Sequence, residues 1–277
     1  MEGTADTTTM IEYSVMMYYT PQMAKITPDI RGFVDQVLAE TNQGYRNSRV
    51  AMTIKLHCLE KATVDDTGSS SATLSNFVAM KGSTSSLRHS ADTAVLLVAS
   101  ACGRAYGINT ISHGQTISVC AKSCALGYFS FGHELAQSIG AYHNRETGLI
   151  NPFYSYGQGH LIEKGRATAS IGFRSIMAYY ATGHHTRGNY YSNPDEIFPA
   201  TGTATGTDKS NNAAVLTRNR IALSKVGDES AACKGLTTTT TTTTTTVRTP
   251  TGTAQLVHGN NVLEYCAYSE GLCKVGR

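Results

Sequence analysis

One short segment has residues whose types and spacing could bind a metal ion and activate water. Residues 131–146 read FGHELAQSIGAYHNRE and contain His133, Glu134 and His143. In the pattern HExxHxxGxxH, two histidines four residues apart share one face of a helix, and the glycine permits a turn that brings the third histidine back. The acidic residue after the first histidine serves as general base for the water that zinc activates. This spacing is that of a catalytic zinc site.

Gln137 stands where the pattern requires its second histidine. A neutral imidazole is a strong zinc donor, whereas an amide oxygen is a weak donor better suited to hard cations, so we expect the zinc affinity to fall. Three structural outcomes are open: Gln137 weakly completes the ligand set, His184 or His185 replaces it, or zinc is absent and the fold is kept for binding. A single-base sequence variant is a fourth explanation, because histidine and glutamine codons differ at one position.

Several other kinds of function are excluded. The sequence contains no GxSxG motif and no P-loop, and a GxG that starts at Gly157 lacks its third glycine because Ile162 occupies that place. With 23 Lys and Arg against 20 Asp and Glu, and no run of basic and aromatic residues, we expect no nucleic-acid partner. The longest apolar stretch, residues 94–102, is about half of the roughly 20 residues that a membrane span needs.

The elements that must position the zinc-site segment alternate between strands and helices. Residues 11–19 alternate as a strand, and a helix capped by Asp29 and ended by Gly44 should follow. Residues 49–59 alternate as a second strand, and the aliphatic run 94–101 is typical of a fully buried strand. This order predicts an α/β layered domain with a mixed sheet.

The composition divides the chain into three parts. Residues 1–226 are predicted to form one domain, because hydrophobic periodicity is sustained from Ile11 onward. Residues 227–252 are predicted to be a linker, because their threonine run, residues 237–246, cannot bury enough apolar area to offset the entropy of ordering. The run is either an acceptor for O-glycans or an unmodified spacer. Residues 253–277 form a short tail that contains Cys266 and Cys273.

A second motif lies downstream of the zinc-site segment. Residues 175–179, SIMAY, look like the methionine turn of metzincins, and flanking stretches such as YSYG at 154–157 and YYSNP at 190–194 strengthen the match. Residues 11–230 therefore resemble the adamalysin-like (reprolysin) family of metzincin zinc endopeptidases. The resemblance implies a metzincin (zincin-like) catalytic domain with a mixed, mostly parallel twisted sheet, an active-site helix and a methionine turn.

The resemblance also implies roles for individual residues. His133 and His143 would be zinc ligands, with Gln137 in the second ligand position, and Glu134 would be the general base and acid. Tyr179 would be an auxiliary oxyanion stabiliser. Gly140 would form the turn, Met177 would be the floor of the site, and Cys102 and Cys124 would form a disulfide. Asn144 stands where many members of the family have aspartate.

These expectations lead to two hypotheses about function. In the first, the chain is a Zn²⁺-dependent metalloendopeptidase that hydrolyses protein or peptide substrates, with activity weakened by Gln137. In the second, it is a catalytically inactive pseudoprotease that serves as an extracellular protein-binding module.

The seven cysteines indicate an oxidising compartment, so we expect a secreted protein with disulfide bonds. No N-terminal signal peptide is present, so we expect the sequence to start inside a longer precursor. The odd count leaves an extra thiol, for which Cys120 is the candidate, with Cys58 as a possible partner. Cys266 and Cys273 could close a small loop in the tail.

Overall fold

The computed structural model describes residues 8–162, 172–179 and 185–228, together with the backbone of three later strands. It divides into two compact units, Met1–Leu236 and Thr237–Arg277, which are described separately. The domain boundaries at residues 226 and 252 stay a prediction. No helix in the described part of the chain is both long and apolar enough to cross a membrane.

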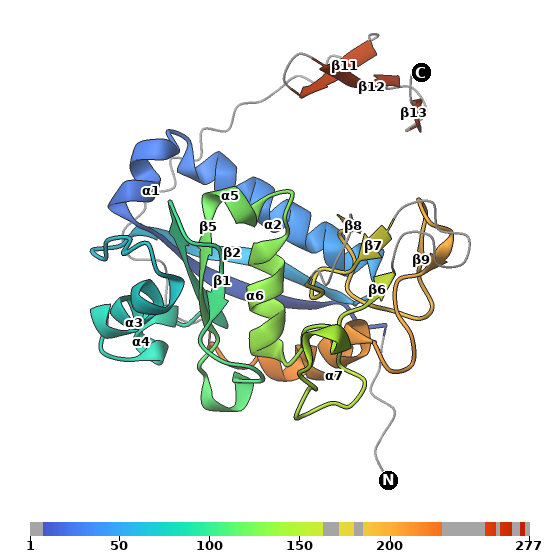
Figure 1. The fold of residues 1–277 in the computed structure, drawn as a ribbon. Helices are drawn as coiled ribbons and strands as arrows, with labels where there is room; N and C mark the ends of the chain where they lie inside the picture. Colours follow the sequence, from blue (N-terminus) through green and yellow to red (C-terminus); the bar gives the residue numbers. More distant parts are fainter. Residues whose placement is uncertain are drawn as a thin grey trace. The chain divides into compact units, whose positions relative to one another are not determined.

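The first unit is built on a five-stranded sheet with the strand order β2-β1-β3-β5-β4 (Figure 1). Neighbouring strands among β2, β1, β3 and β5 are parallel, whereas β4 runs antiparallel to β5 at the edge. The mixed, mostly parallel sheet predicted from the sequence is confirmed. The strands are β1 (Ile11–Tyr19), β2 (Met52–Lys61), β3 (Thr93–Val98), β4 (Arg104–Ala105) and β5 (Ile117–Ala121).

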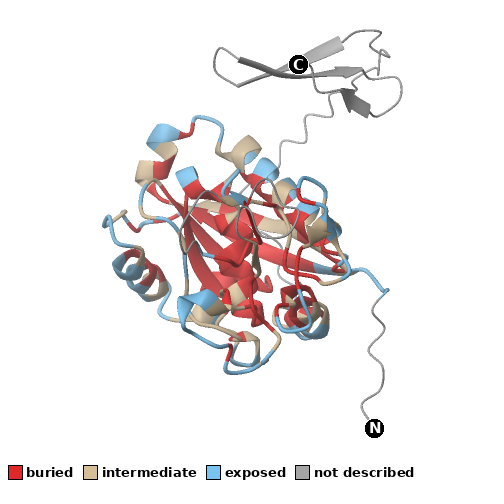
Figure 2. Cartoon of the chain, turned by 45° about the vertical axis from the view of Figure 1, so that its right-hand side comes forward, coloured by how far each residue is buried: buried red, intermediate tan, exposed pale blue. Residues whose placement is uncertain are grey.

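Helices cover both faces of this sheet. Successive side chains of a strand point to opposite faces, and both faces carry apolar side chains that must be buried. Tyr13, Val15 and Met17 of β1 belong to one core cluster, and Met16 and Tyr18 belong to a second. The first cluster includes residues of α2 (Ile30–Asn47), α6 (Ser130–Ile139) and α7 (Asn212–Leu223). The second includes residues of α3 (Ser70–Met80) and α4 (Thr84–Arg88). Figure 2 shows that the sheet and α6 are the most continuously buried parts of the unit.

Shorter elements complete the first unit. Beyond α6, β6, β7 and β8 form a small sheet, in which β7 and β8 are parallel, and β9 pairs with β10. Their bounds are β6 (Leu161–Ile162), β7 (Gly172–Arg174), β8 (His185–Arg187), β9 (Ile197–Phe198) and β10 (Thr203–Ala204). The short helices are α1 (Pro21–Ile26), α5 (Lys122–Ala125), η1 (Ile111–His113) and η2 (Arg145–Thr147).

The second unit contains an antiparallel sheet in the order β11-β12-β13. Its strands are β11 (Thr253–His258), β12 (Asn261–Ala267) and β13 (Leu272–Lys274). Cys266 lies directly opposite Cys273 in the register of β12 and β13. That these two cysteines close a loop stays a prediction.

One helix boundary differs from the predictions. The strand 11–19 and the Asp29 cap are confirmed, and Asp29 Oδ1 accepts a hydrogen bond from the Gly32 amide at 2.8 Å. The prediction that Gly44 ends the following helix is wrong, because α2 continues to Asn47. Gly44 is needed for close packing instead, since a Cβ atom there would lie 2.6 Å from Asn189 Oδ1.

The structure shows the bonding state of the four cysteines in the first unit whose side chains it describes. Cys102 and Cys124 form a disulfide, as the resemblance implied. Cys120 is a buried free thiol, and burial raises its pKa well above the usual value. Cys58 is disulfide-bonded, and Cys120 is not its partner because Cys120 is free. The suggested pairing of Cys58 with Cys120 is therefore wrong.

Candidate active site

The helix α6 and the turn that follows it bring the three predicted metal ligands together. His133 and Gln137 are four residues apart and so lie on one face of α6. The helix ends at Gly140, whose φ of 109° is in the left-handed region that favours glycine, and the chain then returns to His143. His143 Nε2 lies 3.2 Å from His133 Nε2 and 2.6 Å from Gln137 Nε2.

Hydrogen bonds around His133 fix the direction of its ring. His133 Nδ1 lies 2.9 Å from the carbonyl oxygen of Ile176, to which it can donate. With its proton on Nδ1, the imidazole presents the lone pair of Nε2 toward His143 and Gln137. Ile176 directly precedes Met177, which is fully buried. The segment predicted to be a methionine turn therefore contacts the site through its backbone, while the role of Met177 as a floor stays a prediction.

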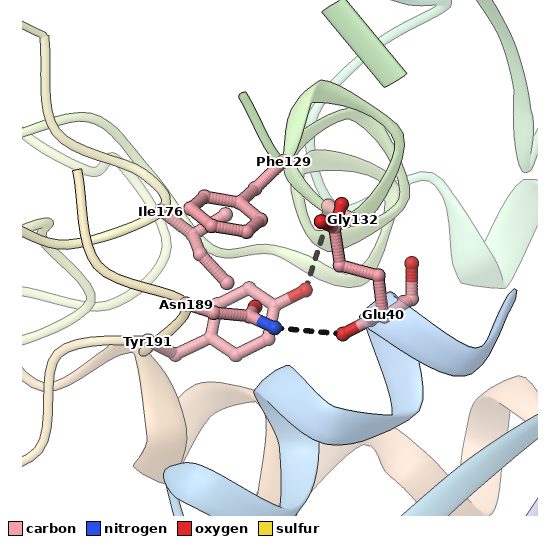
Figure 3. Close-up of a pocket in the computed structure, with 7 residues that line it drawn as sticks. Glu40, Phe129, Gly132, Ile176, Asn189 and Tyr191 are labelled. Atoms are coloured by element: carbon pink, nitrogen blue, oxygen red, sulfur yellow. Dashed lines mark hydrogen bonds between the residues drawn. The ribbon is translucent and has the colours of Figure 1, made fainter. Parts of the chain in front are cut away.

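α6 also packs against α2 and residues 189–191, which line a narrow crevice together with Gly132 of α6 (Figure 3). The hydroxyl of Tyr191 donates to the Gly132 carbonyl at 3.0 Å, and the Asn189 amide donates to the Glu40 carbonyl at 2.8 Å. A Cβ atom at Gly132 would lie 3.0 Å from the Tyr191 hydroxyl. The glycine before His133 therefore lets α6 approach this support closely.

Burial keeps both imidazoles neutral. It lowers the pKa of His133 well below the usual value and that of His143 to about 4, and the charge of Arg187 adds to both effects. Neutral imidazole is the form that binds a metal ion. At neutral pH the two side chains are therefore in the protonation state that a metal site requires.

Glu134 lies beside the edge strand β4. Burial raises its pKa to about 8, against the opposing effects of the Ala105 backbone amide and of two charges, Arg187 and Arg104. A Cβ atom at Gly103 would lie 2.6 Å from Glu134 Oε1, so glycine leaves room for the carboxyl group. A carboxyl group whose pKa is close to neutral is suited to accept and donate a proton.

Tyr179 covers the outer side of the two histidines. Its ring centroid lies 4.3 Å from that of His143 and 5.5 Å from that of His133. The Tyr179 backbone amide donates to Asn144 Oδ1 at 2.8 Å, and Asn144 is buried. Asn144, which stands where many family members have aspartate, therefore ties the SIMAY segment to the loop after His143.

The two histidines have the spacing of ligands to one metal ion. Two nitrogens bound to a tetrahedral zinc at about 2.0–2.1 Å would be about 3.3–3.4 Å apart, and the Nε2 atoms of His133 and His143 are 3.2 Å apart. The third position is weaker, because the Gln137 amide can offer only its oxygen. No group of three His, Cys, Asp or Glu side chains suited to a metal occurs in the described residues. His185 does not join the pair, and His184 lies outside the described residues.

The sequence patterns did not single out Arg187, whose guanidinium contacts His133. Its Nη2 atom lies 3.0 Å from His133 Nδ1 and donates to the Ile176 carbonyl, which also accepts from Arg187 Nε at 3.1 Å. An isolated arginine after the SIMAY segment matches no ligand or nucleophile pattern. Its position depends on the pairing of β7 with β8, which the sequence did not indicate.

A buried helix that presents an imidazole and a carboxyl group, followed by a turn that brings back a second imidazole beside a mostly parallel sheet, is the arrangement of a metallopeptidase catalytic domain. Residues 11–192 match the family model described as metallo-peptidase family M12, and the chain belongs to this family. The predicted metalloprotease class is confirmed at this level. The family also implies protein or peptide substrates.

The chain is similar to bacterial enzymes named peptidyl-Asp metalloendopeptidase. It is 34% identical over 175 residues to one from Stenotrophomonas maltophilia (strain K279a), an alignment that covers 60% of this chain and 41% of the relative. It is 31% identical over 156 residues to one from Pseudomonas fragi, covering 56% of this chain and 83% of the relative. The chain thus spans about two fifths of the length of the Stenotrophomonas relative.

One solved structure supports the fold alone. The structure titled "Structure of a chaperone-substrate complex" matches with a TM-score of 0.60 and 17% sequence identity. The match covers 79% of this chain and 35% of that chain.

Proposed function

We propose that this chain is a metzincin-type, adamalysin-like zinc metalloendopeptidase domain whose metal affinity is reduced by Gln137. The observation that supports it most is the convergence of His133, Gln137 and His143 at hydrogen-bond distances, with Glu134 on the same helix. His133 and His143 would hold Zn²⁺ through their Nε2 atoms. Gln137 would complete the set through Oε1, which requires only that the amide oxygen rather than its nitrogen face His143.

The chain's own residues would divide the chemistry between them. Zinc, when bound, supplies a Lewis acid that polarises the scissile carbonyl and lowers the pKa of water. The Glu134 carboxylate takes a proton from the attacking water and delivers it to the leaving amine. The Tyr179 hydroxyl, close to both histidines, donates to the oxyanion that develops on the carbonyl oxygen. Arg187 and burial keep His133 and His143 neutral and able to bind the metal.

The substrate class follows from the names of the relatives. Because they are named peptidyl-Asp metalloendopeptidase, we propose that the chain acts on peptide bonds next to aspartate. The disulfide between Cys102 and Cys124 supports an oxidising compartment, and we propose a secreted protein.

A second function is favoured by one observation, the amide in the middle ligand position. If zinc does not bind, the same cleft would serve an extracellular pseudoprotease as a peptide-binding groove. The two functions are separated by cleavage of an unfolded protein substrate by the natural chain, Gln137→His and Glu134→Ala, with and without a chelator.

Chelator-sensitive cleavage by the natural chain that is lost in Glu134→Ala is the result expected for the enzyme. Cleavage seen in Gln137→His but not in the natural chain would favour the pseudoprotease. Failure of Gln137→His to gain any chelator-sensitive cleavage or zinc would refute the proposed site itself.

A further inference from the structure

Next to the proposed metal site, two arginines pack against one tyrosine ring. Arg174 in β7 and Arg187 in β8 are register partners in adjacent parallel strands, so their side chains lie next to each other. The guanidinium of Arg187 lies 4.9 Å from the centroid of the Tyr128 ring, and that of Arg174 lies 5.2 Å from it. We call Tyr128, Arg174 and Arg187 the basic cluster.

No ion pair among the described residues joins Arg187 to a carboxylate, and Glu134 acts on its charge without forming one. The donors of Arg187 reach neutral acceptors: the Ile176 carbonyl at 3.1 Å from Nε, and the Tyr128 carbonyl at 2.6 Å from Nη1. Burial and the neighbouring charge of Arg174 lower the pKa of Arg187 to about 10. A partly buried guanidinium that is not in an ion pair favours the arrival of an anion.

The basic cluster lies within reach of the reacting groups and of solvent. Arg187 Nη2 is 3.0 Å from His133 Nδ1, and its charge acts on Glu134 together with that of Arg104. Tyr128 and Tyr179 are each 45% exposed. Because both contact or face Arg187, a peptide laid beside Tyr179 could bring a side chain to the cluster. The hydroxyl of Tyr128 accepts a hydrogen bond from Arg174 at 3.1 Å.

We propose that Arg187, held against Tyr128, is the specificity-determining residue that binds an acidic side chain of the substrate next to the scissile bond. Arg187 Nε and one N–H of Nη2 already donate to the Ile176 carbonyl, and one N–H of Nη1 donates to the Tyr128 carbonyl, so a substrate carboxylate would accept from the remaining N–H groups of Nη1 and Nη2. Such a charge-assisted contact is not available to a neutral amide or an apolar side chain of the substrate. The inference rests on the proposed function and gives its substrate class a structural cause. Arg187 also donates to the Ile176 carbonyl and so has a structural role. The test must therefore separate carboxylate binding from this structural role.

The test compares two fluorescein-labelled peptides that differ only in one Asp or Asn and are otherwise uncharged. Their Kd values are measured by anisotropy with the full-length chain in excess chelator, so that neither zinc nor turnover is required. We expect the natural chain to bind the Asp peptide about 10- to 100-fold more tightly, as for a charge-assisted hydrogen-bonded pair. Arg187→Gln should bring the ratio close to one. Arg187→Lys, which keeps the charge but not the planar fork, should lower the ratio without abolishing it.

Arg31→Gln is the matched control, because it removes an equal charge from the exposed face of α2, where Arg31 pairs with Asp35. It should leave the ratio unchanged. A ratio near one in the natural chain would overturn the proposal without any variant, and so would a folded Arg187→Gln chain that keeps the full Asp preference. If the natural chain binds no zinc and cleaves nothing, the proposed enzyme fails, yet an Asp preference that depends on Arg187 would still support this inference.

Discussion

Burial shifts the pKa values of the histidines and of the glutamate at the site in opposite directions. Burial lowers the pKa of His133 and His143 and raises that of Glu134 to about 8. The first effect prepares two neutral metal ligands, and the second leaves a carboxyl group that holds its proton in the absence of a cation. The metal-free site is therefore nearly uncharged except for Arg187, and a bound dication would favour ionisation of Glu134.

This arrangement predicts a pH dependence of stability in the metal-free protein. The Glu134 carboxyl group loses its proton at a pKa of 4.5 when unfolded and at about 8 when folded, so the folded state holds more protons between these values. Its favourable contribution is full below pH 4.5 and is lost as the pH rises to about 8. Between pH 7 and 8 the histidines, whose pKa is 6.5 when unfolded and lower when folded, act in the opposite direction, and this effect fades toward pH 8. We expect the free energy of unfolding to fall by up to about 1.4 kcal/mol per pH unit there.

Urea unfolding in excess chelator at several pH values between 7 and 8 measures this slope. Glu134→Gln, which cannot ionise, should flatten it. An equal slope in the natural chain and in Glu134→Gln would show that another group is responsible.

At the scale of elements, the site depends on how closely α2, α6 and the SIMAY segment approach one another. Gly44 of α2 faces Ile176 and Asn189, and Gly132 of α6 faces Tyr191. The Ile176 carbonyl in turn orients His133. Two glycines, of which Gly44 is far from the metal ligands in sequence, therefore help to set the position of a ligand.

Gly44→Ala tests this dependence because two effects of known size oppose each other. Alanine in a helix interior is favoured over glycine by about 1 kcal/mol, but a Cβ atom here would lie 2.6 Å from Asn189 Oδ1 and 3.2 Å from Ile176 Cδ1. Overpacking of this kind costs about 1–3 kcal/mol, so we expect a net loss of about 1 kcal/mol in the free energy of unfolding.

Urea unfolding also measures the effect of Gly44→Ala. Gln43→Ala, on the exposed side of the same helix, should change stability by less than about 0.5 kcal/mol. A gain in stability from Gly44→Ala would mean that helix propensity outweighs packing and that the contact with Ile176 is loose.

The sequence predicted the parts of the fold that have strong local patterns. The alternation in residues 11–19 and the aliphatic run that contains β3 gave the central strands, and the spacing of His133, Gly140 and His143 gave the helix and turn of the site. Gly44 was misjudged because the local rule that glycine ends a helix was outweighed by a tertiary contact. The pairing of β7 with β8, which places Arg187, depends on short strands that have no periodicity to detect.

At the scale of the whole molecule, the chain consists of two compact units with separate sheets. The metal-site residues all belong to the first unit. The match to family M12, residues 11–192, also lies within it. The chemistry proposed for the chain therefore needs only residues of the first unit.

A chain that ends at Leu236 should accordingly keep the stability and the zinc affinity of the full chain. Thermal unfolding and zinc titration of both forms provide the comparison. A marked loss of stability in the shortened chain would mean that residues after Leu236 support the first unit.

The proposed zinc-dependent activity requires that His133, Gln137 and His143 form one metal site. The most direct measurement is the zinc Kd of the natural chain and of Gln137→His, by competition with a chelator of known affinity. Because loss of even an outer hydrogen-bond partner of a ligand weakens metal binding about 10- to 100-fold, restoring an imidazole at position 137 should tighten it by at least about 100-fold. Equal affinities, or no zinc bound by either protein, would contradict the account.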